Sequence, residues 1–409
     1  MSREPIAIIG RSCLFPDVDS PKDFWEVISQ NKDRFREVSE ERLGINPQEI
    51  KGTKGSLDKT YSTRCSYIDH KIVLESFRDK LTFIDDLDPY YHWTLWILGK
   101  ALDDAGLSEG MKSRSGLILA NLTFALESAQ ECHEDAIVKW LDSQINNRSR
   151  ETRDPLSLYH LHQSARPAEL ASSFFGLGLT PFALDAACAS SLYAVDLACQ
   201  SLWRGDADAM IAMGVNRSEM VALQVGFSQL GAYSQQGQCL PFDQSADGLV
   251  VGEGGGALVL KKLSRAQIDG DKIYGLIRGT GTSCDGQDGG LLAPSHEGQV
   301  RALNEAYEIS GVNPAEVRFV ECHGTATARG DATEINTLKK VFNRSDRKFK
   351  LGIGSVKSNF GHCLSAAGMA SLMKMLQAIE HGAAPATKFS TPGAGVVDNQ
   401  DWLELVSHE

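Results

Sequence analysis

The stretch Asp185-Ala186-Ala187-Cys188-Ala189-Ser190-Ser191 stands between a predicted strand and a predicted helix. The apolar run at 181–184 is typical of a short buried strand, and apolar residues over 192–202 recur at helical spacing. Cys188 is therefore expected at a helix N-terminus, where unpaired N–H groups and a partial positive charge favour a thiolate. The alternative is a small core cysteine, which is the commoner situation of a free cysteine.

Composition excludes several classes of protein. The chain has 409 residues, 42% hydrophobic and 23% charged, which is ordinary for a globular protein with a large core. A net charge of −12 argues against a nucleic-acid partner, and no apolar run is long enough for a membrane span. Nine cysteines without a C-x-x-C pair argue against a disulfide framework and a metal site of the zinc type. A reducing, cytoplasmic location fits this pattern best.

Predicted strands alternate with predicted helices, which indicates an α/β fold with parallel sheets covered on both faces. The pattern starts again near Leu263, and this suggests two similar halves, residues 1–262 and 263–409. Residues 31–70 are polar and turn-rich and are expected as a surface excursion. The predicted strands are 5–10, 117–120, 181–184, 209–215, 257–260, 273–281, 317–322 and 351–356. The predicted helices are 21–30, 90–105, 136–141, 167–175, 192–202, 297–310, 333–342 and 366–380.

Two later loops each carry a histidine directly after a predicted strand. They are Glu321–Asp331, with His323, and Lys357–Gly368, with His362. Because loops at the carboxyl ends of parallel strands converge, these histidines can meet Cys188. A single histidine in such a loop is equally consistent with a backbone hydrogen-bonding role. A thiol and two imidazoles together indicate a specific chemistry.

Small residues in the same loops leave room for a narrow substrate. Gly324, Gly361 and Gly368 permit tight turns and close approach of a thin substrate arm. Thr325 and Thr327 alternate, so their hydroxyls can face one channel and bond to amides of that arm.

These loops resemble those of β-ketoacyl synthases, the condensing enzymes of fatty acid and polyketide assembly, and the similarity spans nearly the whole chain. The resemblance implies a thiolase-like α/β fold of five layers, α-β-α-β-α, with two related halves and usually a homodimer. The matching motifs are residues 185–191, 241–243, 246–248, 252–254, 323–325, 330–331, 357–359, 361–362 and 366–368.

The resemblance also implies roles for individual residues. Cys188 would be the nucleophile that takes an acyl group from a carrier-protein thioester. His323 and His362 would line the place where a malonyl-type extender loses CO₂, so that their N–H groups meet the developing enolate. No metal or cofactor bound by this chain is implied, because the phosphopantetheine arm comes with the acyl carrier protein.

Further residues are assigned supporting or binding roles by the same resemblance. Lys357 would lie behind the second histidine and tune the electrostatics, with Asp331 and Glu334 as candidate counter-ions, although a plain surface lysine is the alternative. The candidate substrate-binding residues are Thr325, Thr327, Asn359 and Phe360.

The chain departs from the family at several positions. Cys322, Ala326 and Ala332 stand where alanine, glycine and proline are usual. Ser371 replaces the acidic residue of discrete bacterial synthases, which favours the polyketide or polyunsaturated-fatty-acid branch, with sequence drift as the alternative explanation. The sequence stops at Glu409, before the phenylalanine- and glycine-rich loop and final strand of the family. From the sequence alone we expect an open sheet edge and poor autonomous activity.

Three other functions compete with condensation. A chain-length or scaffolding partner of the same fold would have no use for all three catalytic side chains. A thiolase would need a second cysteine as base, and Cys363 and Cys284 are available without thiolase surroundings. A cysteine hydrolase would leave the second histidine loop without a role.

Two surfaces are predicted less specifically. Docking of an acyl carrier protein needs local patches of basic residues. Basic residues that simply face solvent, without a partner, are the alternative interpretation. The candidates are Lys139, Arg148, Arg150, Arg153 and Arg166. An acyl tunnel or a dimer contact is expected near Met220, Phe227, Leu230 and residues 127–165, which are otherwise ordinary core.

Overall fold

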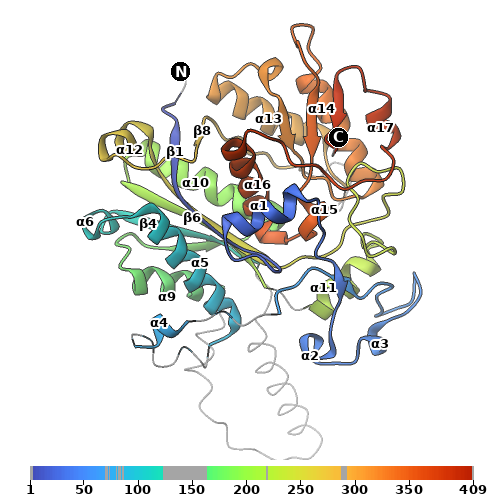
Figure 1. Ribbon diagram of the computed structural model, residues 1–409, viewed down its shortest axis with the longest axis horizontal. Helices are drawn as coiled ribbons and strands as arrows, with labels where there is room; N and C mark the ends of the chain where they lie inside the picture. The colour runs from blue at the N-terminus through green and yellow to red at the C-terminus, as the bar shows by residue number, and fades with distance from the viewer. Residues whose placement is uncertain are drawn as a thin grey trace, which may run out of the picture.

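Two main β-sheets with helices between and outside them, together with a small two-stranded sheet, make up the described part of the fold (Figure 1). The structure is a computed structural model and describes residues 3–407 except 70–71, 73, 80, 82–83, 85–86, 123–163, 218–219 and 287–292. The predicted helix at 136–141 and four of the candidate carrier-docking residues lie outside the described residues. Within the described part, the layers follow the order α-β-α-β-α that the resemblance implies.

The strands and helices have the following bounds in the structure. The strands are β1 Ile6–Leu14, β2 Arg36–Glu37, β3 Arg64–Cys65, β4 Ser115–Ala120, β5 Phe182–Leu184, β6 Ala209–Asn216, β7 Gly254–Lys262, β8 Gly275–Ile277, β9 Phe319–Glu321, β10 Leu351–Gly354 and β11 Leu403–Leu405. The helices are α1 Pro21–Ser29, α2 Glu40–Leu43, α3 Pro47–Ile50, α4 Glu75–Arg78, α5 Pro89–Ala105, α6 Glu109–Lys112, α9 Arg166–Phe175, α10 Ser190–Arg204, α11 Met220–Gln229, α12 Leu263–Asp269, α13 His296–Ser310, α14 Ala328–Phe342, α15 Lys357–Phe360, α16 Ala367–His381 and α17 Ala394–Val397.

The larger sheet has the strand order β5-β4-β6-β7-β1-β8. Strands β5, β4 and β6 are parallel, but β7 is antiparallel to both β6 and β1. The prediction of wholly parallel sheets is therefore wrong for this sheet. Between β6 and β7 the chain runs through α11 and a long loop, and an antiparallel neighbour needs no helical crossover.

Helices cover both faces of the larger sheet. Helices α5 and α9 pack on one face, and α10 and α16 pack on the other. Helix α5 begins where Asp88 accepts a hydrogen bond from Tyr90 N and ends at Gly106, whose φ of 60° is left-handed. In the described residues, no helix is long and apolar enough to cross a bilayer.

The smaller sheet has the order β11-β10-β9, and its strands are parallel. Helices α13 and α14 pack on it through a separate apolar cluster. Helix α16 lies between the two sheets: Met369 and Leu376 pack on the larger sheet, and Lys374 reaches Glu321 of β9. The sequence did not predict β11, which pairs Leu403 with Leu351.

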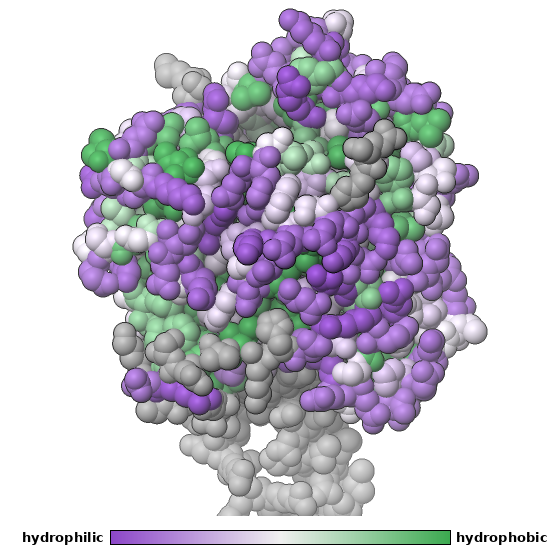
Figure 2. All heavy atoms as spheres, viewed as in Figure 1, coloured by the Kyte–Doolittle hydropathy of each residue, from purple (hydrophilic) through white to green (hydrophobic). Residues whose placement is uncertain are grey.

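Residues 31–70 are more than a surface excursion, so this prediction is wrong. Phe35, Val38, Cys65 and Tyr67 are buried in an apolar cluster that also contains Cys188 as a partly buried member. Their apolar side chains are widely spaced among charged residues, which hides the burial from a periodicity analysis. The outer face seen in Figure 2 is mainly hydrophilic, with hydrophobic residues in separate patches, as is usual for a globular protein.

Candidate active site

A sharp turn between β5 and α10 presents Cys188. The turn contains Ala187 with a φ of 51°, a left-handed conformation that is costly for a residue with a side chain. Asp185 Oδ1 accepts a hydrogen bond from Ala187 N at 2.8 Å, and Ser190 Oγ donates to Ala187 O at 2.6 Å. These bonds fix a strand-to-helix turn of the kind that exposes a nucleophile.

His362 lies against the cysteine. Its Nε2 is 2.9 Å from Cys188 Sγ. The backbone of His362 is clamped by the extended segment at 250–252, with its N–H donating to Val250 O at 2.7 Å and its carbonyl accepting from Gly252 N at 3.0 Å. Leu364 N donates to His362 Nδ1 at 3.3 Å, which assigns the ring proton to Nε2. His362 therefore points an N–H donor at the sulfur.

His323 completes the group from the end of β9. The centroids of the two imidazoles are 5.3 Å apart and their planes are nearly perpendicular, at 85°. Glu334 accepts hydrogen bonds from His323 N at 2.7 Å and Gly324 N at 2.8 Å, which fixes the loop. His362 is only 1% exposed, whereas His323 is exposed to solvent. The structure thus brings all three predicted catalytic side chains together.

Lys357 provides the positive charge near these groups. Its side chain is buried at 2% exposure. Burial, then Lys357 and His323, lower the pKa of His362 well below its ordinary value. Desolvation by the surrounding protein and the charge of Lys357 also lower the pKa of His323. Because the residue is exposed, solvent and salt weaken both effects. Both imidazoles are therefore neutral N–H donors at pH 7.

The thiol does not follow the sequence-based expectation of a favoured thiolate. Burial raises the pKa of Cys188, and the nearby Asp185 raises it further. Lys357 and a backbone hydrogen bond at Cys188 lower the same pKa but do not outweigh burial. The sequence shows the helix N-terminus but not how closely the apolar cluster surrounds the sulfur.

The two candidate counter-ions of Lys357 bond to backbone groups instead. Asp331 Oδ2 accepts from Phe242 N at 2.7 Å, and both oxygens of Glu334 are used by the His323 loop. Among the described side chains, no carboxylate lies within ion-pair distance of Lys357. Burial raises the pKa of Asp331 to about 7 and also raises the pKa of Glu334. Both carboxylates thus position loops.

The candidate binding residues divide into two pairs. The hydroxyls of Thr325 and Thr327 lie 3.0 Å apart, which agrees with the expectation that they face one side. Asn359 is fully buried, with Nδ2 donating to Lys32 O at 3.0 Å. Phe360 is also fully buried and stacks on Phe24, with centroids 5.1 Å apart. The structure gives Asn359 and Phe360 a packing role rather than the predicted substrate contact.

The residues predicted for the acyl tunnel, and the cysteine considered as a thiolase base, differ in their surroundings. Phe227 packs in the same apolar cluster as Cys188, whereas Leu230 is 52% exposed, and the side chain of Met220 lies outside the described part. The Cys363 thiol donates to Glu253 O at 3.5 Å, and burial raises its pKa to about 12. A buried, protonated thiol is a poor base, which argues against Cys363 as the second cysteine of a thiolase.

The motif at residues 252–254 was matched from the sequence, but no role in the site was predicted for Glu253. Glu253 is fully buried, forms an ion pair with Arg42, and accepts from Ile68 N at 3.1 Å. It directly continues the segment that clamps His362, so it ties residues 40–68 to the histidine loop. A glutamate between two glycines, Gly252 and Gly254, was the available signal.

Comparison with protein families agrees with this geometry. The N-terminal domain of β-ketoacyl synthases matches residues 3–266, and the C-terminal domain of the same enzymes matches residues 274–389. The chain belongs to the β-ketoacyl synthase family, whose members are acyltransferases that perform the condensation step of polyketide biosynthesis. This family uses an active-site cysteine rather than a bound cofactor, and it acts on substrates attached to carrier proteins.

Individual relatives are larger proteins. A phenolphthiocerol/phthiocerol polyketide synthase of Mycobacterium tuberculosis is 35% identical over 93% of this chain, which spans 20% of that protein. Polyketide synthase PksL of Bacillus subtilis is 34% identical over 91% of the chain and 8% of its own length. Among solved structures, the PfaC keto synthase–chain length factor superposes with a TM-score of 0.86 and 34% identity, covering 95% of this chain and 43% of that one.

Proposed function

We propose that this chain condenses a Cys188-bound acyl group with a malonyl-type carrier protein by decarboxylative Claisen chemistry. In the first half-reaction, the Cys188 sulfur attacks the thioester carbonyl of an acyl carrier protein. The bond from the acyl carbon to the carrier sulfur breaks, and the carrier thiol leaves with the proton of the cysteine. The acyl group is then held as a thioester on Cys188.

In the second half-reaction, the malonyl-type extender loses CO₂. The electrons of the broken carbon–carbon bond become an enolate, whose oxygen accepts hydrogen bonds from Nε2–H of His323 and His362. The enolate carbon attacks the acyl carbonyl on Cys188 and forms the new carbon–carbon bond. The carbon–sulfur bond then breaks, and the departing Cys188 thiolate takes a proton from water. Preorganised donors of this kind lower the barrier because they already point at the developing charge.

The observation that carries this proposal is the contact between Cys188 Sγ and His362 Nε2, which are 2.9 Å apart. The ring of His323 lies beside that of His362, with 5.3 Å between the ring centroids. The tautomer of His362, with Nδ1 bonded to Leu364 N, supports a donor rather than a base. Thr325 and Thr327 are proposed to contact the phosphopantetheine arm of the carrier protein. A chain-length or scaffolding partner of the same fold is the competing function.

Several wider features belong to the same proposal. We infer two related halves, residues 1–262 and 263–409, and a homodimer, as the resemblance implies. The carrier protein supplies the phosphopantetheine arm, and polyketide or fatty acid assembly is the pathway class. Cytoplasmic location is proposed because the cysteines that the structure describes are free thiols.

A two-step assay tests this proposal. Acyl carrier protein with a labelled acyl group is mixed with the chain, and the Cys188 peptide is analysed by mass spectrometry. Malonyl carrier protein with a labelled carboxyl is then added, and CO₂ and the 3-oxoacyl product are measured. Both should appear, and Cys188→Ala should abolish acylation. Acylation without CO₂ release would favour a hydrolase or thiolase, and neither step would favour a scaffolding partner.

A further inference from the structure

A buried ion pair outside the catalytic group links the elements that carry the two histidines. Glu321, the last residue of β9, lies two residues before His323. Its Oε2 is 2.8 Å from Nζ of Lys374 on α16, the helix that follows the His362 loop. The side chain of Lys374 is fully buried and that of Glu321 is 3% exposed.

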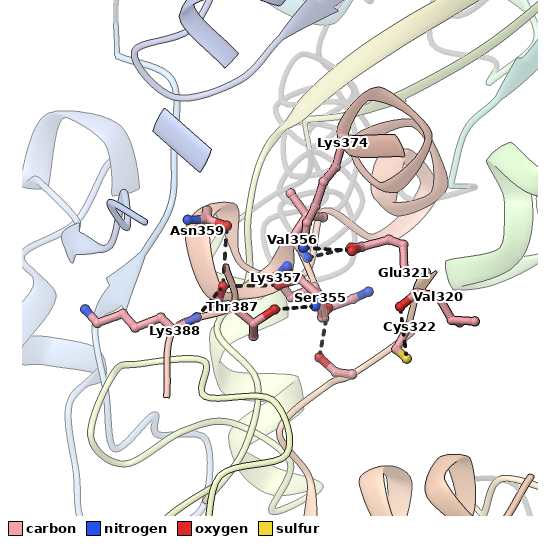
Figure 3. A network of polar contacts seen from close by, with 12 residues as sticks. Val320, Glu321, Cys322, Ser355, Val356, Lys357, Asn359, Lys374, Thr387 and Lys388 are labelled. Atoms are coloured by element: carbon pink, nitrogen blue, oxygen red, sulfur yellow. Dashed lines mark hydrogen bonds and ion pairs between the residues drawn. The ribbon is translucent and has the colours of Figure 1, made fainter. Parts of the chain in front are cut away.

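The second oxygen of the glutamate reaches a third element. Glu321 Oε1 accepts a hydrogen bond from Val356 N at 2.6 Å, and Val356 immediately precedes Lys357 and α15 (Figure 3). One carboxylate therefore joins the end of β9, the turn into α15 and the middle of α16. Neither Lys374 Nζ nor Glu321 Oε2 has a hydrogen-bonding partner among the residues that the structure describes, so the contact between them is an ion pair.

The surroundings are shaped for this pair. Gly354 at the end of β10 has no side chain, and a Cβ there would collide with Thr387 Oγ1 and lie 3.2 Å from Lys374 Nζ. Thr387 Oγ1 in turn accepts from Ser355 N at 3.0 Å. The ring of Phe319 covers Lys374, with Nζ 5.5 Å from its centroid. The ammonium group is thus enclosed by backbone, a hydroxyl and an aromatic face.

Stability alone is a weak reason for such a pair. Replacing a buried ion pair with apolar side chains of similar volume is often neutral or stabilising, and in some proteins such a pair instead selects one arrangement of the elements that it joins. Here those elements carry His323 on one side and His362 on the other. The spacing of the two rings is the geometric quantity that this pair can hold constant.

We propose that Glu321 and Lys374 are positioning residues that set the spacing of His323 and His362 for decarboxylation. The inference rests on the proposed function, because the spacing matters only if both rings hold one enolate oxygen. Acylation of Cys188 depends on the cysteine turn and on His362, whereas loss of CO₂ requires both rings. Disturbing the pair should therefore slow the second step selectively.

The test uses the double variant Glu321→Gln with Lys374→Met, which removes both charges and nearly conserves volume. Glutamine can still accept the hydrogen bond from Val356 N. We expect kcat for CO₂ release from malonyl carrier protein to fall about 10- to 100-fold. Losses of this size are usual when residues that hold a catalytic side chain in place are removed, or when that side chain moves by about 1 Å. KM and the rate of Cys188 acylation should change by less than about twofold, because the variant keeps the contacts that bind the substrate equally in the ground state and the transition state.

Lys261 provides a matched control. Its ammonium is also buried, at 1% side-chain exposure, and lies 2.6 Å from Asp271 Oδ2 at the far end of β7. Lys261→Met should leave both acylation and CO₂ release unchanged. Equal melting temperatures of the wild type and the double variant will confirm that the fold is retained.

The outcomes are distinct. A wild-type chain that releases no CO₂ contradicts the proposed function itself. An active wild type with a double variant that decarboxylates equally well overturns the positioning role, as does an equal loss in both steps. If the double variant does not fold, the Glu321→Asp variant tests the positioning role instead, because it keeps the negative charge but has a side chain that is one methylene group shorter. It should show the same selective loss, and an equal loss in both steps would again overturn the inference.

Discussion

Replacing His362 by glutamine and by alanine separates an N–H donor from a proton-transferring acid. The ring proton is on Nε2, because Nδ1 accepts from Leu364 N, and Nε2 lies 2.9 Å from Cys188 Sγ. Glutamine places an amide N–H near the position of Nε2 but has no titratable proton. Alanine removes the donor altogether.

The expected magnitudes follow from the donor role. Losing one oxyanion donor costs about 2.7–4 kcal/mol, so His362→Ala should lower kcat for CO₂ release about 10²- to 10³-fold. His362→Gln should stay within about tenfold of the wild type, because an imperfect neutral hydrogen bond is worth about 0.5–1.5 kcal/mol. Melting curves serve as the control, since His362 is only 1% exposed.

The pH dependence gives a second readout of the same prediction. Burial, Lys357 and His323 lower the pKa of His362 below the ordinary histidine pKa of 6.5. The imidazolium form therefore loses its extra proton at a lower pH, and the ring is neutral above pH 6.5. CO₂ release from labelled malonyl carrier protein should therefore not fall between about pH 6.5 and 8 through this group. A glutamine variant as inactive as the alanine variant, with a wild-type rate that drops steeply over this range, would refute the donor role.

Three further predictions concern neighbouring residues. Lys357→Met should raise the pKa of the Cys188 thiol further, because the lysine charge lowers it, so iodoacetamide alkylation at neutral pH should slow; an unchanged pH profile would contradict this. Phe360→Ala should cost about 3–5 kcal/mol in denaturant unfolding, and a loss below about 1 kcal/mol would show that Phe360 is not core. Burial raises the pKa of Asp331 to about 7, so the folded chain binds a proton that the unfolded chain releases. Stability should fall as the pH rises from about 4 to 7, and Asp331→Asn should flatten that fall; a variant with the wild-type slope would contradict the shift.

The catalytic group could be predicted because its signals are local. Cys188 lies in a run of small residues between a strand and a helix, and each histidine follows a strand within a glycine-rich loop. Such turns depend on residues close in sequence, and the topology of parallel strands then brings their carboxyl ends together.

The remaining features depend on contacts that are distant in sequence. Phe360 adjoins the catalytic loop in sequence, yet its ring points into a core formed with Phe24. The sign of the Cys188 pKa shift is set by an apolar cluster that includes Phe35 from a segment expected at the surface. The pairing of Glu321 with Lys374 joins residues that no periodicity connects.

The most direct test is a crystal structure of the chain with a non-hydrolysable malonyl-pantetheine analogue bound beside Cys188. The distances from the carbonyl oxygen of the analogue to Nε2 of His323 and to Nε2 of His362 are the quantities to measure. Both should be about 2.7–3.1 Å, the range for donors that hold an oxyanion. An oxygen beyond hydrogen-bonding distance of both rings, or an analogue bound away from the sulfur, would contradict the account.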